Sequence, residues 1–224
     1  PGEGKYAMYT KERLMRTCSI AFQHWEKEKA QGAIEVIAVE QPFNIEMPDG
    51  KFISGRADQI IKWNGKIWGR DFKTTSKMLK YFEATLDPND QAIRYIYMES
   101  KLHFGSEAIK NGTMIQGIIF EVLQNLADTD GGKKPGICAI SNVTITKSKY
   151  QLETWEKEQL FMHKILELAE KEDIWPMQPS NCSFCDFHHV CRKSSESAME
   201  YELKNSFKLS PWDNTKVHQE VIAE

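Results

Sequence analysis

The chain has 224 residues, of which 41% are hydrophobic and 27% are charged, and this composition is ordinary for a globular protein with a sizeable core. The length predicts one domain, or one domain with an appendage. The formal net charge is −3 and the isoelectric point is about 6.1, which excludes a general attraction to nucleic acid through counterion release. Any contact with a polynucleotide must therefore come from local patches or from bound metal.

Membrane insertion and secretion are not expected from the hydrophobic pattern. No run approaches the roughly 18 to 20 apolar residues of a membrane span, and no charged and then apolar leader opens the chain. We therefore expect a cytoplasmic protein without a membrane partner. Because the chain opens Pro1-Gly2-Glu3-Gly4 without a methionine, we also expect that upstream residues of the natural protein are missing.

The first half of the chain predicts one helix followed by an antiparallel meander. Apolar residues at helical spacing indicate a helix that Thr10 caps and Gly32 ends. Extended segments follow, and the dipeptides Asp49-Gly50 and Asn64-Gly65 favour tight hairpin turns between them. The predicted elements are a helix at Thr10 to Ala30 and strands at Ala33 to Glu40, Phe43 to Met47, Phe52 to Trp63 and Lys66 to Thr74.

The second half alternates helical and extended patterns. The predicted elements are helices at Ser76 to Thr85, Asn89 to Phe104 and Lys149 to Lys171, and strands at Met114 to Leu123 and Ile137 to Thr146. This order predicts an α/β sandwich with a mixed central sheet, an antiparallel hairpin meander and flanking helices. We expect a core at residues 1–175, a metal-cluster segment at 176–193 and a polar tail at 194–224. The last residues of the tail, about 20 in number, are expected to be poorly ordered or to wrap the surface.

Two carboxylates stand at matched positions of one predicted hairpin. Asp58 lies six residues before Asn64 and Asp71 lies six residues after Gly65, so a two-residue turn places them almost opposite each other. Directly opposed residues have Cβ atoms about 4.5 to 5.5 Å apart. Two carboxylates at that separation repel each other unless a cation lies between them, which makes Asp58 and Asp71 candidate ligands of Mg²⁺.

Lys73 lies two residues beyond Asp71, so strand alternation puts its ammonium on the same face. This group fits phosphodiester hydrolysis, in which the acids hold an ion that polarises the phosphate and lowers the pKa of a bound water. Lys73 would orient that water or stabilise developing charge. A solvated group of ion pairs on an exposed strand is the alternative. Trp68 and Phe72 flank Asp71 in a segment that looks central, where unpaired charge is costly, and this favours the catalytic interpretation.

Three motifs occur in the order that characterises one branch of nucleases. They are Gly55-x-x-Asp58, Asp71-x-Lys73 and Gln91-x-x-x-Tyr95. In this set the chain resembles the RecB-like branch of the PD-(D/E)XK nuclease superfamily. The resemblance implies a restriction-endonuclease-like fold in which the two acids bind metal and the lysine is catalytic. Gln91 and Tyr95, one helical turn apart on one face, would support the site or contact the DNA strand.

The resemblance extends the expected metal-ligand set beyond the two aspartates. Many members of the branch carry a glutamate where Glu40 stands, and the implied set comprises Asp58, Asp71, Phe72 and Glu40. The branch also has a histidine in a helix upstream of these motifs, and His24 is the one candidate in this sequence. We favour a structural role for His24, with the motif histidine lying before Pro1.

The C-terminal part carries a dense cysteine triplet, Cys182-x-x-Cys185 followed by five residues and Cys191. Such spacing in an intracellular chain indicates metal. Within the RecB-like branch it resembles the [4Fe-4S] staple of the CRISPR adaptation nucleases and of AddB-type nuclease domains, which thiolates bind. The resemblance implies a structural cluster completed by an upstream cysteine. Cys18 is the favoured fourth ligand, although a buried thiol would explain it too, and Cys138 is a weaker candidate.

A zinc site is the competing interpretation of the triplet. His188 or His189 falls between Cys185 and Cys191 and would complete a local set of three cysteines and one histidine. The loop is tight for a tetrahedral site, so we favour the iron-sulfur centre.

These features together predict a DNA exonuclease that uses Mg²⁺ or Mn²⁺ on single strands or duplex ends, in a bacterial or phage-infected cell. A phage or mobile-element origin and a helicase or recombination partner are also expected. Lys77, Lys80 and Arg94 lie near the predicted site and would meet phosphates, although a solvated charged face explains them equally well. The alternatives are a non-catalytic module that binds DNA or a partner, and a zinc-dependent interaction protein.

Overall fold

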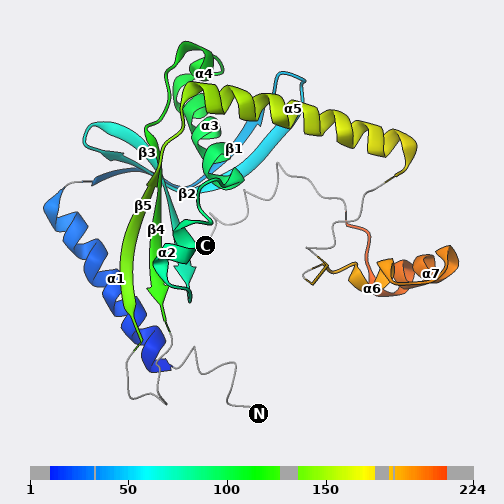
Figure 1. Cartoon of the computed structure of the whole chain (residues 1–224), viewed down its shortest axis with the longest axis horizontal. Coiled ribbons are helices and arrows are strands. Elements are labelled where there is room, and N and C mark those ends of the chain that lie inside the picture. Colours follow the sequence, from blue (N-terminus) through cyan, green and yellow to red (C-terminus); the bar gives the residue numbers. More distant parts are fainter. Residues whose placement is uncertain (1–10, 33, 127–135, 175–181, 184, 211–224) are drawn as a thin grey trace. The chain divides into compact units, whose positions relative to one another are not determined.

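The computed structural model describes residues 11–32, 34–126, 136–174, 182–183 and 185–210. The chain divides into two compact units, residues 1–160 and 161–224, and each is described by itself. The first unit holds a five-stranded sheet of order β1-β2-β3-β4-β5 (Figure 1). Its strands are β1 (Ile34–Glu46), β2 (Phe52–Trp63), β3 (Lys66–Thr75), β4 (Gly117–Asn125) and β5 (Cys138–Ile145).

The sheet is mixed, as predicted. Strands β3 and β4 are parallel, whereas the three other neighbouring pairs are antiparallel. The parallel pair is connected through α2 (Leu79–Glu83), α3 (Asp90–Phe104) and α4 (Ala108–Asn111). Strand β3 occupies the centre of the order, which confirms that Asp71 stands in a central strand.

The meander has one strand fewer than predicted. The segments at Ala33 to Glu40 and Phe43 to Met47 form the single strand β1, which pairs with β2 along almost its whole length. Glu40, expected to end a strand, therefore lies inside β1 with a left-handed φ of 50°. The Asn64-Gly65 hairpin is confirmed, with positive φ at both residues and Trp63 paired with Lys66 across a two-residue turn.

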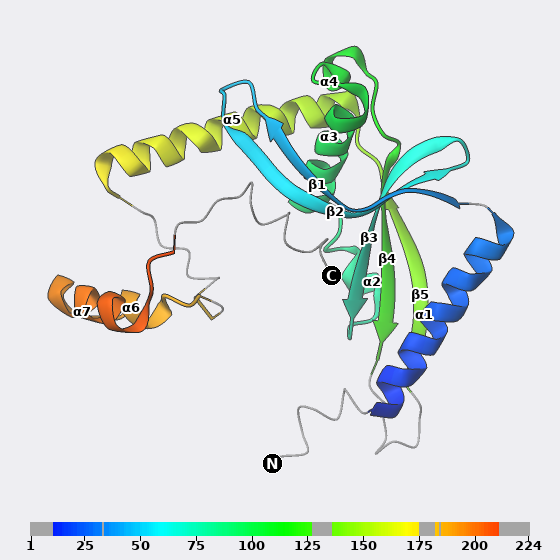
Figure 2. The same cartoon turned by 180° about the vertical axis from the view of Figure 1, so that it is seen from behind.

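Helices cover both faces of the sheet. Helix α1 (Lys11–Gln31) lies on one face beside β4 and β5, and α3 lies on the other with the first part of α5 (Lys149–Glu172) (Figures 1 and 2). The predicted cap Thr10 lies outside the described residues, and Gly32 follows the end of α1 with φ 60°. Helix α2 is shorter than the predicted helix at Ser76 to Thr85, and α4 was not predicted.

The core lies between the sheet and α3. Hydrophobic side chains of β4, α3 and α5 with at most 1% exposure meet there, among them Ile96, Ile118, Phe120 and Leu152. Burial of several large aliphatic and aromatic side chains, each contributing roughly 1.5–3 kcal/mol, holds α3 against the strands. This packing fixes the helix that carries Gln91 and Tyr95 relative to the strands that carry the two aspartates.

The second unit contains the remaining described helices, α6 (His188–Cys191) and α7 (Glu196–Ser206). Helix α7 lies in the segment predicted as a polar tail, and Ser195 caps it by accepting a hydrogen bond from the Ala198 backbone N–H. Residues 211–224, which make up most of the stretch expected to be poorly ordered, lie outside the described residues. No helix in the described part of the chain is long and apolar enough to cross a membrane.

Gly55, the first residue of the Gly55-x-x-Asp58 motif, is required by the packing of Phe43. The two residues are paired across β1 and β2, and the Phe43 ring lies over Gly55 and contacts Tyr95 with ring centroids 6.0 Å apart. A Cβ atom on Gly55 would lie 2.4 Å from Phe43 Cζ. Because Phe43 is 3% exposed, its ring has little room to move.

Replacing Gly55 by alanine should therefore destabilise the fold, by about 1–3 kcal/mol for an overpacked core. Gly69→Ala on β3 is the matched control, since its Cβ would meet Ile118 Cγ1 at an ordinary 3.6 Å. Urea unfolding of both variants is the measurement. Equal stability of the two variants would show that Phe43 does not select glycine at position 55.

Candidate active site

The candidate site lies where β2 and β3 separate. Their backbone pairing runs from Trp63 and Lys66 to Gln59 and Arg70, and stops there. Continuing the register by one step places Asp58 opposite Asp71. Instead of a further ladder bond, the Phe72 backbone N–H donates to Asp58 Oδ2 at 3.0 Å. The hairpin turn thus brings two carboxylates to the point where the strands divide, as the sequence predicts.

Asp71 is a buried carboxylate beside a lysine. Its side chain is 1% exposed, and its Oδ2 lies 2.6 Å from Lys73 Nζ, which confirms that the two side chains share a face. Burial raises the pKa of Asp71, a shift that the hydrogen bond and charge of Lys73 oppose and the charge of Asp58 reinforces. The Lys73 ammonium also lies 5.7 Å from the centroid of the Phe120 ring.

Gln91 and Tyr95 connect this group to helix α3. Gln91 Nε2 donates to Asp71 Oδ1 at 3.0 Å and to the Tyr95 hydroxyl at 3.2 Å. The Tyr95 hydroxyl donates to the Arg56 carbonyl oxygen at 3.0 Å. Asn89 fixes the start of the helix because its Oδ1 accepts from the Gln91 backbone N–H at 2.7 Å. The structure therefore joins all three sequence motifs through direct contacts.

Comparison with known proteins agrees with this geometry. A family model described as the PD-(D/E)XK nuclease superfamily matches residues 2–192. The chain belongs to the PD-(D/E)XK nuclease superfamily. Its members are metal-dependent nucleases that hydrolyse phosphodiester bonds in DNA and typically use Mg²⁺ or Mn²⁺. The mixed five-stranded sheet with flanking helices is consistent with their restriction-endonuclease-like fold.

Two further similarities accompany the family match. The chain is 27% identical over 158 residues to the Gene 69 protein of Mycobacterium phage L5, an alignment that covers 69% of this chain and 44% of that protein. The chain thus spans less than half the length of that relative. A solved structure titled "Crystal structure of SSO0001" has a TM-score of 0.38 and 16% identity, and the match covers 82% of this chain and 72% of that one.

The other two predicted metal ligands have different surroundings. Glu40 Oε2 lies 3.3 Å from Arg56 Nη1, and the glutamate side chain is 59% exposed. The Phe72 ring packs edge-on against Trp25 with centroids 5.8 Å apart, while its backbone N–H contacts Asp58. The roles of Glu40 and Phe72 as ligands in this superfamily member stay predictions.

His24 belongs to an ion network with partners on β3 and β4. Its Nε2 lies 3.5 Å from Glu28 Oε1 and 3.8 Å from Glu121 Oε2, and the ligand atoms of the three residues fall within 4.8 Å of one another. The Arg70 guanidinium already pairs with both glutamates. Because Arg70 neighbours Asp71 on β3, its side chain points to the opposite face of the sheet. The network therefore holds α1 to the sheet on the face away from Lys73.

The predicted cluster cysteines are divided between the two units. Cys18 is exposed on α1 in the first unit, whereas Cys182, Cys185 and Cys191 lie in the second. The Cys185 backbone N–H donates to the Cys182 carbonyl at 3.4 Å, and the His188 backbone N–H donates to the Cys185 carbonyl at 3.1 Å. Cys191 is the last residue of α6.

The zinc alternative relies on a histidine from the same segment. His189 is engaged elsewhere in its own unit, with Nε2 3.3 Å from Glu202 and its ring stacked on Phe207. This contact leaves His188 as the more available histidine for a local zinc site.

Sequence analysis did not single out Glu99, which follows Gln91 and Tyr95 at the next i, i+4 position of α3. Its side chain is fully buried at 0% exposure, and it lies beside the titratable His103, with Oε2 3.4 Å from the histidine Nε2. Burial raises the pKa of Glu99 to about 7 and lowers the pKa of His103. A glutamate in a helical pattern resembles a surface residue, so the sequence carries no signal for this burial.

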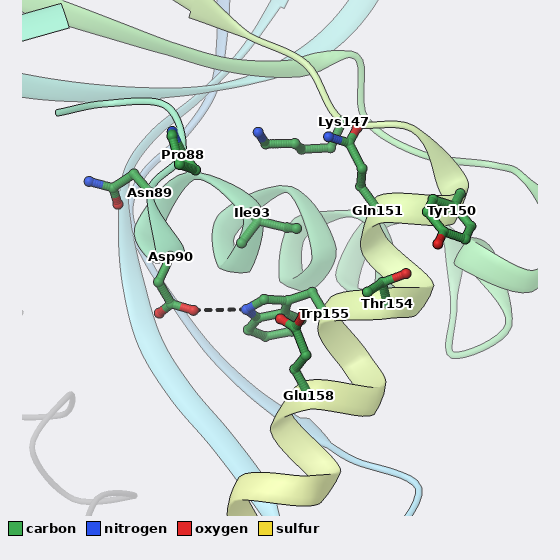
Figure 3. A pocket seen from close by; sticks show the side chains of 10 residues that line it. All are labelled: Pro88, Asn89, Asp90, Ile93, Lys147, Tyr150, Gln151, Thr154, Trp155 and Glu158. Carbon is green, nitrogen blue, oxygen red and sulfur yellow. Dashed lines mark hydrogen bonds between the residues drawn. The ribbon is translucent and has the colours of Figure 1, made fainter. Parts of the chain in front are cut away.

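A cavity of about 400 Å³ lies beside the start of α3, next to α5 (Figure 3). Trp155 of α5 lines it, and its Nε1 donates to Asp90 Oδ1 at 2.8 Å. The cavity is not lined by any of the predicted catalytic residues Asp58, Asp71, Lys73, Gln91 and Tyr95. The Trp155–Asp90 hydrogen bond holds the first turn of α3, which carries Gln91.

Glu99→Gln should change how stability depends on pH. The folded-state pKa of Glu99 is raised from 4.5 to about 7, so the folded state binds more protons between these values and the free energy of unfolding falls as pH rises through them. The variant should lack that slope, so the difference in free energy of unfolding between variant and wild type should favour the variant by on the order of 3 kcal/mol more at pH 8 than at pH 4.5. Glu107→Gln, at a solvent-exposed site, is the control in urea titrations, and an identical pH profile for wild type and Glu99→Gln would contradict the assignment.

Proposed function

We propose that the protein is a DNA exonuclease of the RecB-like branch, which hydrolyses phosphodiester bonds with Mg²⁺ or Mn²⁺ at Asp58 and Asp71. The observation that carries this proposal is the contact of buried Asp71 with both Lys73 and Gln91, at the register position opposite Asp58. The alternative of a solvated ion-pair group does not explain a carboxylate that is 1% exposed. Burying a charge is costly unless it is paired or binds metal.

The donor set fits a hard divalent cation. Asp58 and Asp71 supply carboxylate oxygens, and Glu40 and the Phe72 carbonyl are proposed as further oxygen ligands. Burial raises the pKa of Asp71, and a bound cation would favour its charged form. When bound, the ion would polarise the scissile phosphate and activate a water for attack.

Lys73, Gln91 and Tyr95 have different proposed roles. Lys73 presents its ammonium on the same face as Asp71 and would orient the attacking water or stabilise negative charge that develops on the phosphate. Gln91 fixes the orientation of the Asp71 carboxylate through the 3.0 Å hydrogen bond. Tyr95 is bonded both to Gln91 and to the β2 backbone, so it keeps α3 in register with the strand that carries Asp58.

A [4Fe-4S] cluster bound by Cys182, Cys185, Cys191 and Cys18 is proposed as a structural staple. Four thiolates suit such a cluster, and three of them lie close together in the sequence, between positions 182 and 191. The similarity to a mycobacteriophage protein supports a phage or mobile-element origin. A partner helicase or recombination protein is proposed by analogy with the branch.

Lys73→Ala and Asp71→Ala should each lower cleavage of end-labelled DNA by at least about a hundredfold, the usual contribution of acid-base or electrostatic catalysis. Lys66→Ala, an exposed lysine at the hairpin turn, is the matched control and should cleave normally. The assay compares linear and circular single strands and duplexes with Mg²⁺, Mn²⁺ and EDTA.

The outcomes of this assay separate the candidate functions. An exonuclease leaves circular DNA intact, and cleavage of circles would assign an endonuclease. DNA binding without metal-dependent cleavage would favour the non-catalytic module, and cleavage that survives in both variants would place the active site elsewhere.

Protein purified without oxygen should be brown and contain iron and sulfide, and serine at Cys182, Cys185 or Cys191 should abolish both. Cys138→Ser is the control, because this thiol lies 3.2 Å from Thr17 Oγ1 and is outside the proposed set. Loss of iron in Cys138→Ser but not in Cys18→Ser would show that Cys138, and not Cys18, is the fourth ligand. A colourless protein that contains zinc would show that the triplet forms a zinc site and not an iron-sulfur cluster.

A further inference from the structure

The segment at residues 76–89, here called the α2 segment, is connected at both ends to the candidate active site. It begins directly after β3, whose Lys73 contacts Asp71, and it leads into α3, whose Gln91 contacts the same carboxylate. Lys77 is four residues from Lys73, a reach of at most about 14 Å along the backbone. The segment therefore borders the site, with α2 beside the ends of β3 and β4 (Figures 1 and 2).

Specific contacts hold the start of the α2 segment to the sheet. The Lys77 backbone N–H donates to Thr75 Oγ1 at 3.1 Å, and the Lys77 carbonyl accepts from Gln124 Nε2 at 3.0 Å. Gln124 lies on β4 with 7% exposure. Leu79 and Phe82 of α2 pack against the hydrophobic core. These contacts hold α2 in a fixed position against the sheet.

The outer surface of the α2 segment carries two lysines, two exposed apolar side chains and the exposed acid Glu83. Met78 is 50% exposed and Tyr81 is 60% exposed, and Lys80 Nζ lies 4.7 Å from the centroid of the Tyr81 ring. Lys77 and Lys80 form no ion pair with a carboxylate among the described residues, whereas Arg94 of α3 pairs with Asp90. The segment that borders the carboxylate site therefore presents an exposed aromatic ring with Lys80 over it and with Lys77 four residues before it.

We propose that the α2 segment binds single-stranded DNA next to the scissile phosphate. Tyr81, with Met78 beside it, would stack on an unpaired base, and Lys77 and Lys80 would contact the flanking phosphates. An aromatic side chain with neighbouring cations is the usual platform for single strands because every base offers a stacking face. Bases inside a duplex are already stacked, so this surface would favour single-stranded ends. The proposal rests on the proposed nuclease function and names its substrate class.

The test measures binding of a fluorescent single-stranded oligonucleotide and of the matching blunt duplex by anisotropy with Mg²⁺, in a Lys73→Ala background that suppresses cleavage. Adding Tyr81→Ala should weaken single-strand binding by about tenfold, as expected for loss of one stacked base, and leave duplex binding within about twofold. Tyr81→Phe should bind like the parent. Tyr150→Ala, which removes a tyrosine on α5 that is 75% exposed, should also bind like the parent.

The lysines give a second readout. Lys80→Ala should lower the slope of log affinity against log salt by about 0.7, the contribution of one phosphate contact in a single strand. An unchanged slope together with unchanged binding of Tyr81→Ala would overturn the proposal, as would an equal loss in Tyr150→Ala. Cleavage by the chain with native Lys73 is measured in parallel. If the chain cleaves DNA but Tyr81→Ala does not weaken single-strand binding, this inference is wrong and the proposed function stands. If Tyr81→Ala weakens single-strand binding but the chain with native Lys73 does not cleave, the proposed function is wrong and the binding surface stands.

Discussion

The burial of the Asp71 carboxylate is the constraint on which the rest of the site depends. A charged group at 1% exposure in the central strand needs compensation, and the structure provides it from two directions, Lys73 on the same strand and Gln91 on α3. The core between the sheet and α3 then keeps these donors in place. The packing of α3 against the sheet therefore determines the surroundings of the Asp71 carboxylate.

The two faces of β3 carry charges with different uses. Asp71 and Lys73 point to the α3 face, where oxygen ligands and an ammonium remain available to a metal and a substrate. Arg70 points to the α1 face, where Glu28 and Glu121 neutralise it. A buried ion pair of that kind adds little net stability, yet removing one partner is costly, so it fixes the position of α1. Strand alternation separates the structural network from the candidate catalytic group.

Local sequence signals predicted the parts of the site that depend on local geometry. The Asn64-Gly65 turn set the register that opposes Asp58 and Asp71, and residue spacing placed Lys73 beside Asp71. Contacts between distant segments could not be predicted in the same way. The parallel pairing of β3 with β4, the burial of Glu99 and the continuity of β1 through Glu40 all depend on tertiary packing or on an unusual backbone angle, and no local pattern encodes them.

The central claim is that Asp58 and Asp71 together bind a divalent metal ion, and calorimetric titration with Mn²⁺ in the absence of DNA tests it most directly. The chain should bind Mn²⁺, and Asp58→Asn and Asp71→Asn should each abolish or strongly weaken that binding. Glu28→Gln in the His24 network should leave it unchanged, because Arg70 occupies the space between the glutamates. Binding that survives both aspartate substitutions, or that is lost in Glu28→Gln instead, would contradict the account.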